Sequence, residues 1–442
     1  MREPPLSTLS GWGRHSAQGR ERVGEDLERI SADVNLSRGL GRSYGDASLP
    51  PDDEPTVLNT TFADRILSFD EDSGLFRAES GFTLGELNRL LMPRGYFSPV
   101  SPGTKFVTLG GMVAADVHGK NQHKDGNFGH HVTSLKMRVA DGRVLDCSPE
   151  RHADLFRATI GGMGLTGHIL EVEFGMSRIP SQWICQESRR IHDIDEFQDA
   201  LEESAPEWPY TMGWIDCLAR GKNMGRGILM TGRWAEADQA PPRAPKPGFQ
   251  PSLRFDWPSW VLSGLTIRLF NELYYRKQWR RRSSGIVSHE SFYYPLDAIR
   301  SWNRMYGRRG FTQYQCVLPR EAGRASARRV LDVLTARGGA SFLCVIKDFG
   351  RESKGILSFP RPGITLALDI AVRDDTQDLV DALNEQVIQE GGRIYLAKDS
   401  FTRREHFEAM EGPRLDEFQA IRDRWDPNRR FRSAQSVRLL GD

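Results

Sequence analysis

Cysteine pairs and long apolar runs are both missing from this sequence of 442 residues. Its five cysteines are scattered, without a C-x-x-C pair, so neither a disulfide framework nor a cysteine zinc site is expected. No stretch approaches the ~18 uncharged apolar residues that a membrane-spanning helix requires. The start, MREPP, is not followed by the apolar segment of a secretory leader. We therefore expect a cytoplasmic protein, either free or peripherally attached to the inner membrane.

An excess of one charge is missing as well. Lys and Arg number 60 against 59 Asp and Glu, which leaves a net charge of +1. A protein that grips nucleic acid through its phosphates needs a clear basic surplus, so no nucleic-acid partner is expected. The H-E-x-x-H motif of zinc enzymes does not occur, and we expect no metal. With 38% hydrophobic residues, the chain is typical of a folded protein with two or three domains.

Glycine is abundant and clustered. Clusters at 36–45 (LSRGLGRSYG), 103–111 (GTKFVTLGG) and 161–167 (GGMGLTG) all lie early in the chain. The third contains a literal G-x-G-x-x-G, but a helix is predicted before it and a strand after it. A nicotinamide-binding fingerprint has the opposite order, because the helix that follows it must meet the pyrophosphate. A nicotinamide cofactor is therefore excluded.

Such clusters can bind phosphate without a helix dipole. Gly39, Gly41 and Gly45 allow successive backbone N–H groups to turn inward and form an anion-binding concavity. Arg42 and Ser43 add side-chain donors. One cluster alone more often makes only a tight turn. Three clusters within one predicted domain favour a ligand that contains phosphate.

The predicted elements change in character near Met176. Before it, short strands, a helix opened by the T-x-x-E box at 83–86 and a hairpin turning at Asp141-Gly142 indicate a mixed α/β unit. After it, cleaner alternation and two helices that end in glycine pairs indicate an α+β domain with an antiparallel sheet. Its predicted strands are 211–218, 227–232, 311–318, 342–349 and 364–372, and its helices are 320–337 and 375–390.

Lysines interrupt two apolar strand faces in this second part. Alternate residues of a strand share a face. Lys347 then lies on an apolar face of 342–349, and Lys398 on one of 393–399; Gln313 and Gln315 share a face of 311–318. A single lysine can extend from a sheet edge to water. Two of them near glycine turns favour a desolvated cationic site.

Taken together, these motifs are recognisable. RGLGRSYGD (38–46), VTLGGMVAADVHGKN (107–121) and GGMGLTG, followed by FTQYQ (311–315) and YLAKDS (395–400), resemble the vanillyl-alcohol-oxidase superfamily of FAD-binding (PCMH-type) oxidoreductases. The resemblance extends over nearly the whole chain and is strongest to the decaprenylphosphoryl-β-D-ribose oxidases. It implies an α+β fold with an FAD-binding domain over 1–178 and 396–442 and a substrate-binding cap domain over 179–395. Members with covalent flavin often have a histidine where Arg42 stands, so FAD is expected to be non-covalent.

The resemblance also implies an activity. It is the FAD-dependent oxidation of a secondary sugar hydroxyl to a ketone, at the ribose 2-hydroxyl of a polyprenylphosphoryl ribose. A separate short-chain reductase would complete epimerisation to arabinose for cell-wall arabinan. The alternatives are an aldonolactone or alditol oxidase of the same superfamily, or a non-catalytic binding protein that retains the fold.

Residue roles follow from the same resemblance. Lys398 and His118 are the expected catalytic residues, Lys398 either as general base or as stabiliser of the developing alkoxide. As a base, Lys398 would need its pKa lowered by about three units from ~10.4. Trp214 is expected either in the pocket or in the core. For Lys120, a position on the surface and a position in the site are both open. The expected flavin contacts are Arg38, Gly39, Leu40, Gly41, Arg42, Ser43, Tyr44, Gly45, Gly103, Thr108, Gly110, Gly111, Ala115, Val117, His118, Ile169 and Tyr395. The expected substrate contacts are Trp214, Tyr293, Arg304, Gln313, Gln315, Lys347, Thr365 and Lys398.

Two further features concern the substrate. Thr365 and Ala367 stand where the mycobacterial enzymes of the resembled family have asparagine and cysteine. Both positions line the substrate side in that family. The segment 255–282 combines apolar residues, Trp257 and Trp260 among them, with the basic run Arg280–Arg282. This composition is typical of an element that contacts anionic lipid, although a layer packed on the cap with a solvated basic end would have it too.

Overall fold

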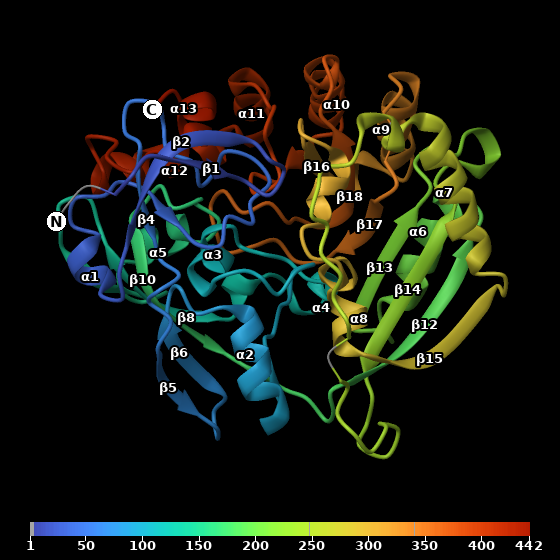
Figure 1. Ribbon diagram of the computed structural model, residues 1–442, viewed down its shortest axis with the longest axis horizontal. Coiled ribbons are helices and arrows are strands. Elements are labelled where there is room, and N and C mark those ends of the chain that lie inside the picture. Colours follow the sequence, from blue (N-terminus) through green and yellow to red (C-terminus); the bar gives the residue numbers. More distant parts are fainter. Residues whose placement is uncertain (1–3, 247, 340) are drawn as a thin grey trace.

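The computed structural model describes residues 4–246, 248–339 and 341–442, so Met1–Glu3 of the predicted first domain lie outside the description. Figure 1 shows three small sheets on the left, one large sheet on the right and a row of helices from the C-terminal quarter along the top. The expected α+β fold is confirmed. No helix in the described ranges has both the length and the apolar character to cross a bilayer.

The small sheets are all built before residue 179. The first has the order β1-β2-β4-β3 and the second the order β5-β6-β10-β8-β9, while β7 and β11 form a pair. Helices α1 (Leu27–Ile30), α2 (Leu84–Leu91), α3 (Leu109–Ala114), α4 (Gln122–Asp125) and α5 (Ala153–Thr159) connect them. The strands are β1 (Ser7–Ser10), β2 (Ser16–Val23), β3 (Ser37–Arg38), β4 (Thr56–Asn59), β5 (Ile66–Asp70), β6 (Leu75–Glu79), β7 (Tyr96–Phe97), β8 (Val132–Arg138), β9 (Val144–Cys147), β10 (His168–Gly175) and β11 (Ser177–Arg178).

The large sheet is antiparallel throughout and has the order β15-β12-β14-β13-β17-β18-β16-β19. Helices α6 (Ile194–Ser204), α9 (Ala325–Ala336) and α10 (Thr376–Gln389) supply apolar residues to the core on one side of it. Helix α7 (Gly264–Lys277) packs near its other side, where Tyr275 joins Trp214 and Ile228. The strands are β12 (Trp183–Ile191), β13 (Tyr210–Ile215), β14 (Gly227–Trp234), β15 (Arg282–Ser288), β16 (Phe311–Pro319), β17 (Cys344–Phe349), β18 (Gly363–Ala371) and β19 (Arg393–Ile394).

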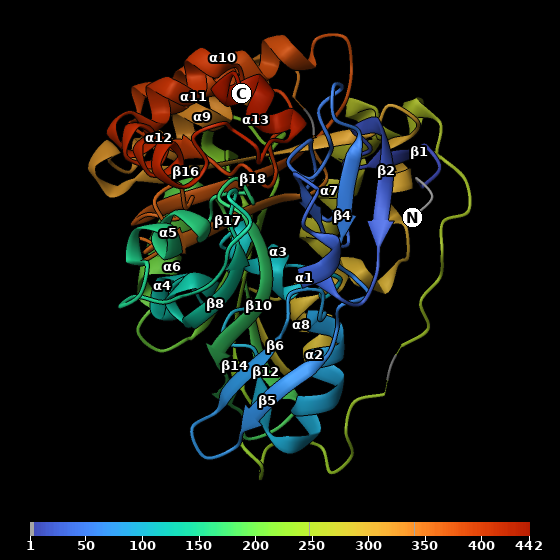
Figure 2. The same ribbon diagram turned by 90° about the vertical axis from the view of Figure 1, so that its left-hand side faces the viewer.

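The chain then returns to its beginning. Figure 2 shows α11 (Arg404–Glu411), α12 (Pro413–Trp425) and α13 (Ala434–Leu440) grouped together at one end of the molecule. The guanidinium group of Arg438 on α13 donates to the carboxylates of Asp46 and Asp399, each at 2.8 Å. Both carboxylates are buried. One side chain of the last helix therefore connects the first glycine cluster to the segment that carries Lys398.

Most predicted elements are present, and two predictions need correction. The helix at 84–91 begins at Thr83, whose Oγ1 accepts from the Glu86 N–H at 3.2 Å. The predicted strand over 393–399 is wrong beyond Ile394, because only Arg393 and Ile394, which form β19, pair with β16. Lys398 lies instead in a turn, where its N–H donates to the Tyr395 carbonyl at 2.9 Å. The helix predicted from 320 begins at Ala325, because Gly323 at φ +78° interrupts it.

The domain boundaries stay a prediction. Every strand of the small sheets precedes the predicted boundary, and every strand of the large sheet lies between Trp183 and Ile394. The largest apolar core is nevertheless continuous across that division, since it includes Phe76 of β6 and Leu366 of β18. A separately folding cap is therefore not implied by the packing.

Candidate active site

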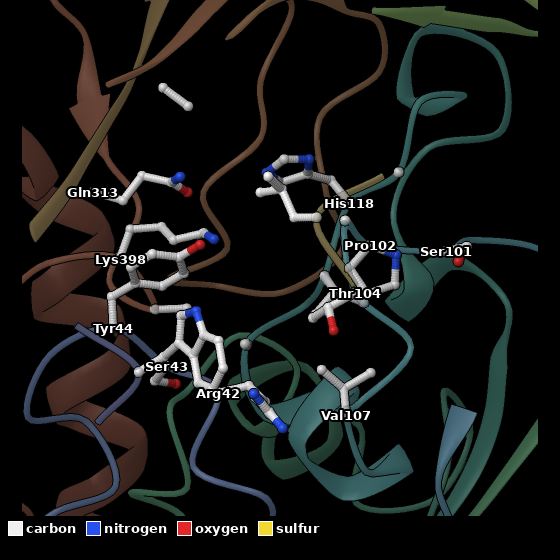
Figure 3. Close-up of a pocket in the computed structure, with 18 of the residues that line it drawn as sticks. Arg42, Ser43, Tyr44, Ser101, Pro102, Thr104, Val107, His118, Gln313 and Lys398 are labelled. Carbon is white, nitrogen blue, oxygen red and sulfur yellow. The ribbon is translucent and has the colours of Figure 1, made fainter. Parts of the chain in front are cut away.

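A cavity of about 720 Å³ lies between the glycine clusters and one face of the large sheet. Figure 3 shows part of it, with Arg42, Ser43 and Tyr44 at its lower edge and His118 across from Lys398. Residues from all three clusters reach the cavity. The clusters predicted to bind phosphate thus share one space with the strands predicted to bind substrate.

The cluster end of the cavity is formed by bare main chain. Gly41 has φ +61°, a left-handed conformation that favours glycine. A Cβ on Gly39 would lie 2.4 Å from Thr108 Oγ1, so the first two clusters approach closely only because residue 39 has no side chain. Thr108 in turn caps α3 by accepting from the Gly111 N–H at 3.3 Å. Two loops and the start of one short helix thereby form a common wall.

This wall fits a dinucleotide. A Cβ on Gly164 would meet nothing within 4 Å, and one on Gly111 would meet only Thr108 Oγ1, so open space lies above both. Arg42 stacks over the Trp12 ring at 4.1 Å, and its buried Nε has no hydrogen-bond partner among the described residues. An unpaired cationic donor in a cavity lined by glycine is suited to a diphosphate. The cavity wall therefore has the shape and the donors that FAD requires.

Fifteen of the expected flavin contacts line the cavity, and two do not. The guanidinium group of Arg38 donates to the Ser10 carbonyl at 2.7 Å and to Ser48 Oγ at 3.0 Å, so it holds the loop from behind. Gly45 packs against main chain, where a Cβ would lie 1.9 Å from the Asp399 carbonyl oxygen. Lining the cavity are Gly39, Leu40, Gly41, Arg42, Ser43, Tyr44, Gly103, Thr108, Gly110, Gly111, Ala115, Val117, His118, Ile169 and Tyr395.

The opposite wall changes from polar to apolar along the sheet. Alternate residues of each strand face the cavity, and the strand order gives their sequence in space. From β16 towards β14 they are Gln313 and Gln315, Thr365 and Ala367, Lys347 and Val345, Met212 and Trp214, and Met230, and Gln186 follows on β12. Amides lie at the β16 end, a cation in the middle, and thioethers and an indole on β13 and β14. This gradient indicates a ligand with a polar head and an apolar tail.

Lys398 lies where the two walls meet. Its Nζ is 3.8 Å from the centre of the Tyr44 ring, and no hydrogen bond or ion pair within 4 Å joins it to a described residue. Burial lowers the pKa of Lys398 to about 7; Asp369 opposes this shift and Lys347 adds to it. An amine with this pKa can hold or release a proton at neutral pH. The side chain reaches the predicted site from a turn, not from the predicted strand.

Asp369 on β18 is a buried residue that the sequence analysis missed. Its carboxylate accepts from the Tyr306 hydroxyl at 2.8 Å and from the Gln313 amide. Burial is the main influence on this carboxyl group and raises its pKa. The alternation that places Thr365 and Ala367 on the cavity side also places Asp369 there, so the pattern could have identified it.

His118 is held as a neutral imidazole. Burial, followed by the charges of Lys347 and Lys398, lowers its pKa well below the usual range. Its Nε2 lies 3.0 Å from the Gln315 amide nitrogen, so Nε2 accepts and Nδ1 carries the proton. The buried Nδ1 has no partner among the described residues. His118 can therefore donate a hydrogen bond but is not a base of neutral-pH strength.

Of the expected substrate contacts, Arg304 is the exception. Its side chain is 40% exposed, donates to the Arg254 carbonyl at 2.9 Å and lies 3.8 Å from Asp256. It is absent from the cavity lining because the short 3-10 helix Trp302–Tyr306 turns Trp302 inward and Arg304 outward. Trp214, Tyr293, Gln313, Gln315, Lys347, Thr365 and Lys398 all line the cavity.

Lys120 is a cation whose place the sequence analysis left open, and the structure puts it in the cavity lining. It is buried, lines the cavity and donates from Nζ to the Tyr293 carbonyl at 3.2 Å. Burial, with a contribution from Lys347, lowers its pKa to about 7. The available signal was its position two residues after His118, directly behind an apolar run. A surface lysine and a cavity lysine give the same local pattern there, so the sequence alone left both open.

Comparison with known proteins agrees with this site. A family model described as an FAD binding domain matches residues 34–148. The chain is 35% identical to decaprenylphosphoryl-β-D-ribose oxidase of Mycolicibacterium smegmatis, over 99% of this chain and 98% of that protein. It is 23% identical to L-gulono-1,4-lactone dehydrogenase of Mycobacterium tuberculosis over 91% and 89% of the two chains. The chain therefore belongs to the vanillyl-alcohol-oxidase superfamily of FAD-dependent oxidoreductases, in the family that contains decaprenylphosphoryl-β-D-ribose oxidase.

Proposed function

We propose that this enzyme oxidises the 2-hydroxyl of a polyprenylphosphoryl ribose to a ketone, using non-covalent FAD. The observation that carries the proposal is the position of Lys398, a half-buried lysine between the flavin-side residue Tyr44 and the polar end of the large sheet. The substrate class is supported by the similarity to decaprenylphosphoryl-β-D-ribose oxidase, which extends over nearly the whole of both chains. In the same proposal, a separate short-chain reductase reduces the ketone to the arabinose epimer used for cell-wall arabinan.

The chain's own residues account for the proton that this oxidation releases. The flavin, when bound, accepts a hydride from the carbinol carbon. Lys398 in its neutral form takes the hydroxyl proton at Nζ, which avoids a free alkoxide in a buried site. Asp369 stabilises the resulting ammonium, because the negative charge of its carboxylate raises the pKa of Lys398. In the alternative role, a protonated Lys398 stabilises the developing alkoxide.

The other residues would bind and orient. His118 offers its Nδ1 proton to the flavin or to the sugar, because its Nε2 already accepts from Gln315. Gln313, whose amide is held by Asp369, would offer its carbonyl oxygen to a sugar hydroxyl. Arg42 and the main chain of clusters 36–45, 103–111 and 161–167 would hold the diphosphate. Closure of both walls around the sugar keeps water from the reacting carbon.

Anaerobic reduction of the flavin tests the proposal. Holoenzyme is mixed with farnesylphosphoryl-β-D-ribose, with ribitol or with an aldono-1,4-lactone, and the visible flavin absorbance is followed. We expect the phosphoryl riboside to bleach the flavin at least about 100-fold more efficiently than either neutral compound, since a buried cation discriminates strongly in favour of an anion. Bleaching by the lactone or the polyol alone would assign the enzyme to the alternative oxidases instead.

We also propose that α7 docks on an anionic lipid surface. Leu265, Leu269 and Leu273 recur every four residues on its outer side and are 78%, 60% and 63% exposed. Phe270 and Tyr274 on the same helix line the cavity, so the outer stripe is continuous with the apolar end of the site. The Trp260 side chain, predicted to belong here, lies outside the description. A lipid substrate could thus enter without crossing water.

Charge selects the kind of surface. Four cations near this stripe are exposed and form no ion pair with a described residue: Arg268, Lys277, Arg280 and Arg282. A basic cluster beside an apolar stripe favours anionic lipid over neutral lipid, with roughly 1 kcal/mol for each cation near the surface. The predicted basic run of 280–282 therefore lies at the end of the docking helix, where β15 begins.

The double variant Leu269→Glu/Leu273→Glu is expected to reduce binding to phosphatidylglycerol vesicles by at least about tenfold, because two apolar anchors become charges that anionic lipid repels. Co-sedimentation measures this, with phosphatidylcholine vesicles as the neutral comparison. Leu67→Glu, at an exposed leucine on the distant β5, is the matched control and should bind as the wild type does. Equal binding of the double variant and the wild type would contradict a docking role for α7.

A further inference from the structure

We infer that Lys120 and Lys347 form a phosphate subsite midway along the cavity, between the sugar end and the apolar end. This inference rests on the proposed function and specifies how its substrate would be recognised. Lys347 extends from β17 on the sheet wall, and Lys120 comes from the loop after α3 on the opposite wall. Arg304, one of the expected substrate contacts, is absent from the cavity lining and takes no part in this subsite.

The two ammonium groups keep most of their hydrogen-bond donors free for a ligand. No hydrogen bond or ion pair from Lys347 Nζ reaches a described residue within 4 Å. Lys120 Nζ makes one bond, to the Tyr293 carbonyl, although an ammonium has three protons to donate. Main chain fixes its position, because the Thr211 N–H on β13 donates to the Lys120 carbonyl at 2.9 Å. Unused donors of buried cations are costly unless a ligand satisfies them.

Nearby acidic groups are occupied elsewhere. Asp348, which follows Lys347, accepts from Thr211 Oγ1 at 2.9 Å and is not in the cavity lining. Asp369 is bound by Tyr306 and Gln313 at the Lys398 end. Burial lowers the pKa of both lysines, and for Lys120 the charge of Lys347 adds to the lowering. A phosphodiester between them would supply the missing negative charge.

Position along the sheet gives the order of the substrate's parts. Lys347 is on β17, between the polar residues of β18 and β16 and the apolar residues of β13 and β14. The substrate can follow this order without bending back. Its sugar would lie near Lys398, its phosphate at Lys347, and its prenyl chain at Trp214, Met230 and Phe270. The same order leads the chain towards α7.

The test measures binding of farnesyl phosphate, which has the phosphate and the prenyl chain but no oxidisable sugar. Calorimetry on FAD-loaded wild type should give a Kd at least about tenfold lower for farnesyl phosphate than for farnesol, and Lys120→Met and Lys347→Met should each remove most of that difference. Lys124→Met, at an exposed lysine four residues from Lys120, is the control. Inorganic phosphate in a third arm shows whether the anion binds without the chain. Flavin content and melting temperature confirm that each variant is folded.

Two outcomes would overturn the subsite. One is equal affinity of the wild type for farnesyl phosphate and farnesol; the other is an equal loss for both ligands in the two variants. Failure of the proposed function is a separate result, in which farnesyl phosphate binds as expected but farnesylphosphoryl-β-D-ribose does not bleach the flavin.

Discussion

Lys398→Met is expected to yield a yellow protein that keeps its FAD but is no longer bleached by substrate. Methionine preserves the apolar volume of the lysine stem and removes the amine. Because a positioned proton acceptor contributes about 10²- to 10⁴-fold to such steps, the rate of flavin reduction should fall at least about 100-fold. FAD should remain, since the ammonium group contacts only the ring of Tyr44 and makes no hydrogen bond to the main chain of the glycine clusters within the described residues. Stopped-flow absorbance measures the rate, and the spectrum of the resting protein measures the occupancy.

Lys354→Met, at an exposed lysine, is the matched control and should reduce at the wild-type rate. The pH profile of the wild type then separates the two roles of Lys398. If the neutral amine is the active form, reduction accelerates as pH rises through about 7, where the pKa of Lys398 lies. If the ammonium is active, reduction slows over the same range. A Lys398→Met protein that still bleaches at the wild-type rate contradicts both roles.

Gly111→Leu is expected to give a folded protein that is nearly colourless. A Cβ at this position meets only Thr108 Oγ1, at 3.1 Å, so the leucine side chain would project into the space that the dinucleotide needs. Overpacking a fitted site costs about 1–3 kcal/mol, which corresponds to about 5- to 150-fold in FAD affinity. The ratio of flavin absorbance to protein absorbance after purification, and a titration with added FAD, measure the loss.

Gly85→Leu provides the control for this prediction. Gly85 is also a helical glycine, but its added Cβ would lie 3.5 Å from the Lys105 carbonyl oxygen, an ordinary contact away from the cavity lining. It should keep its flavin. If Gly111→Leu binds FAD as tightly as Gly85→Leu does, the cofactor does not lie along this wall, and the proposed diphosphate position is wrong.

The sequence predicts the fold and one wall of the site well, because both depend on local chemistry. Glycine clusters specify tight main chain wherever they occur, and the left-handed φ of +61° at Gly41 agrees with that requirement. Strand alternation predicted which face of its own strand carries Lys347, Gln313 and Gln315, and all three line the cavity. These inferences need no knowledge of how distant segments meet.

The errors arise where tertiary contacts decide. Arg304 was expected in the pocket because phosphate needs cations, but a short 3-10 helix directs it to Asp256 at the surface. Lys120 was left open because only the opposite wall, through Tyr293 and Thr211, buries it. Lys398 reached the cavity although the strand argument for it was wrong, since a turn and not a strand carries it. Local pattern identifies candidate side chains, whereas the facing wall determines which of them are used.

Arg438 has a consequence for how the enzyme can be handled. Its guanidinium group holds Asp46 beside the first glycine cluster and Asp399 beside Lys398. Because the same side chain anchors both places, removal of α13 should reduce flavin content and turnover together. Purification handles and reporter fusions should therefore leave this helix uninterrupted.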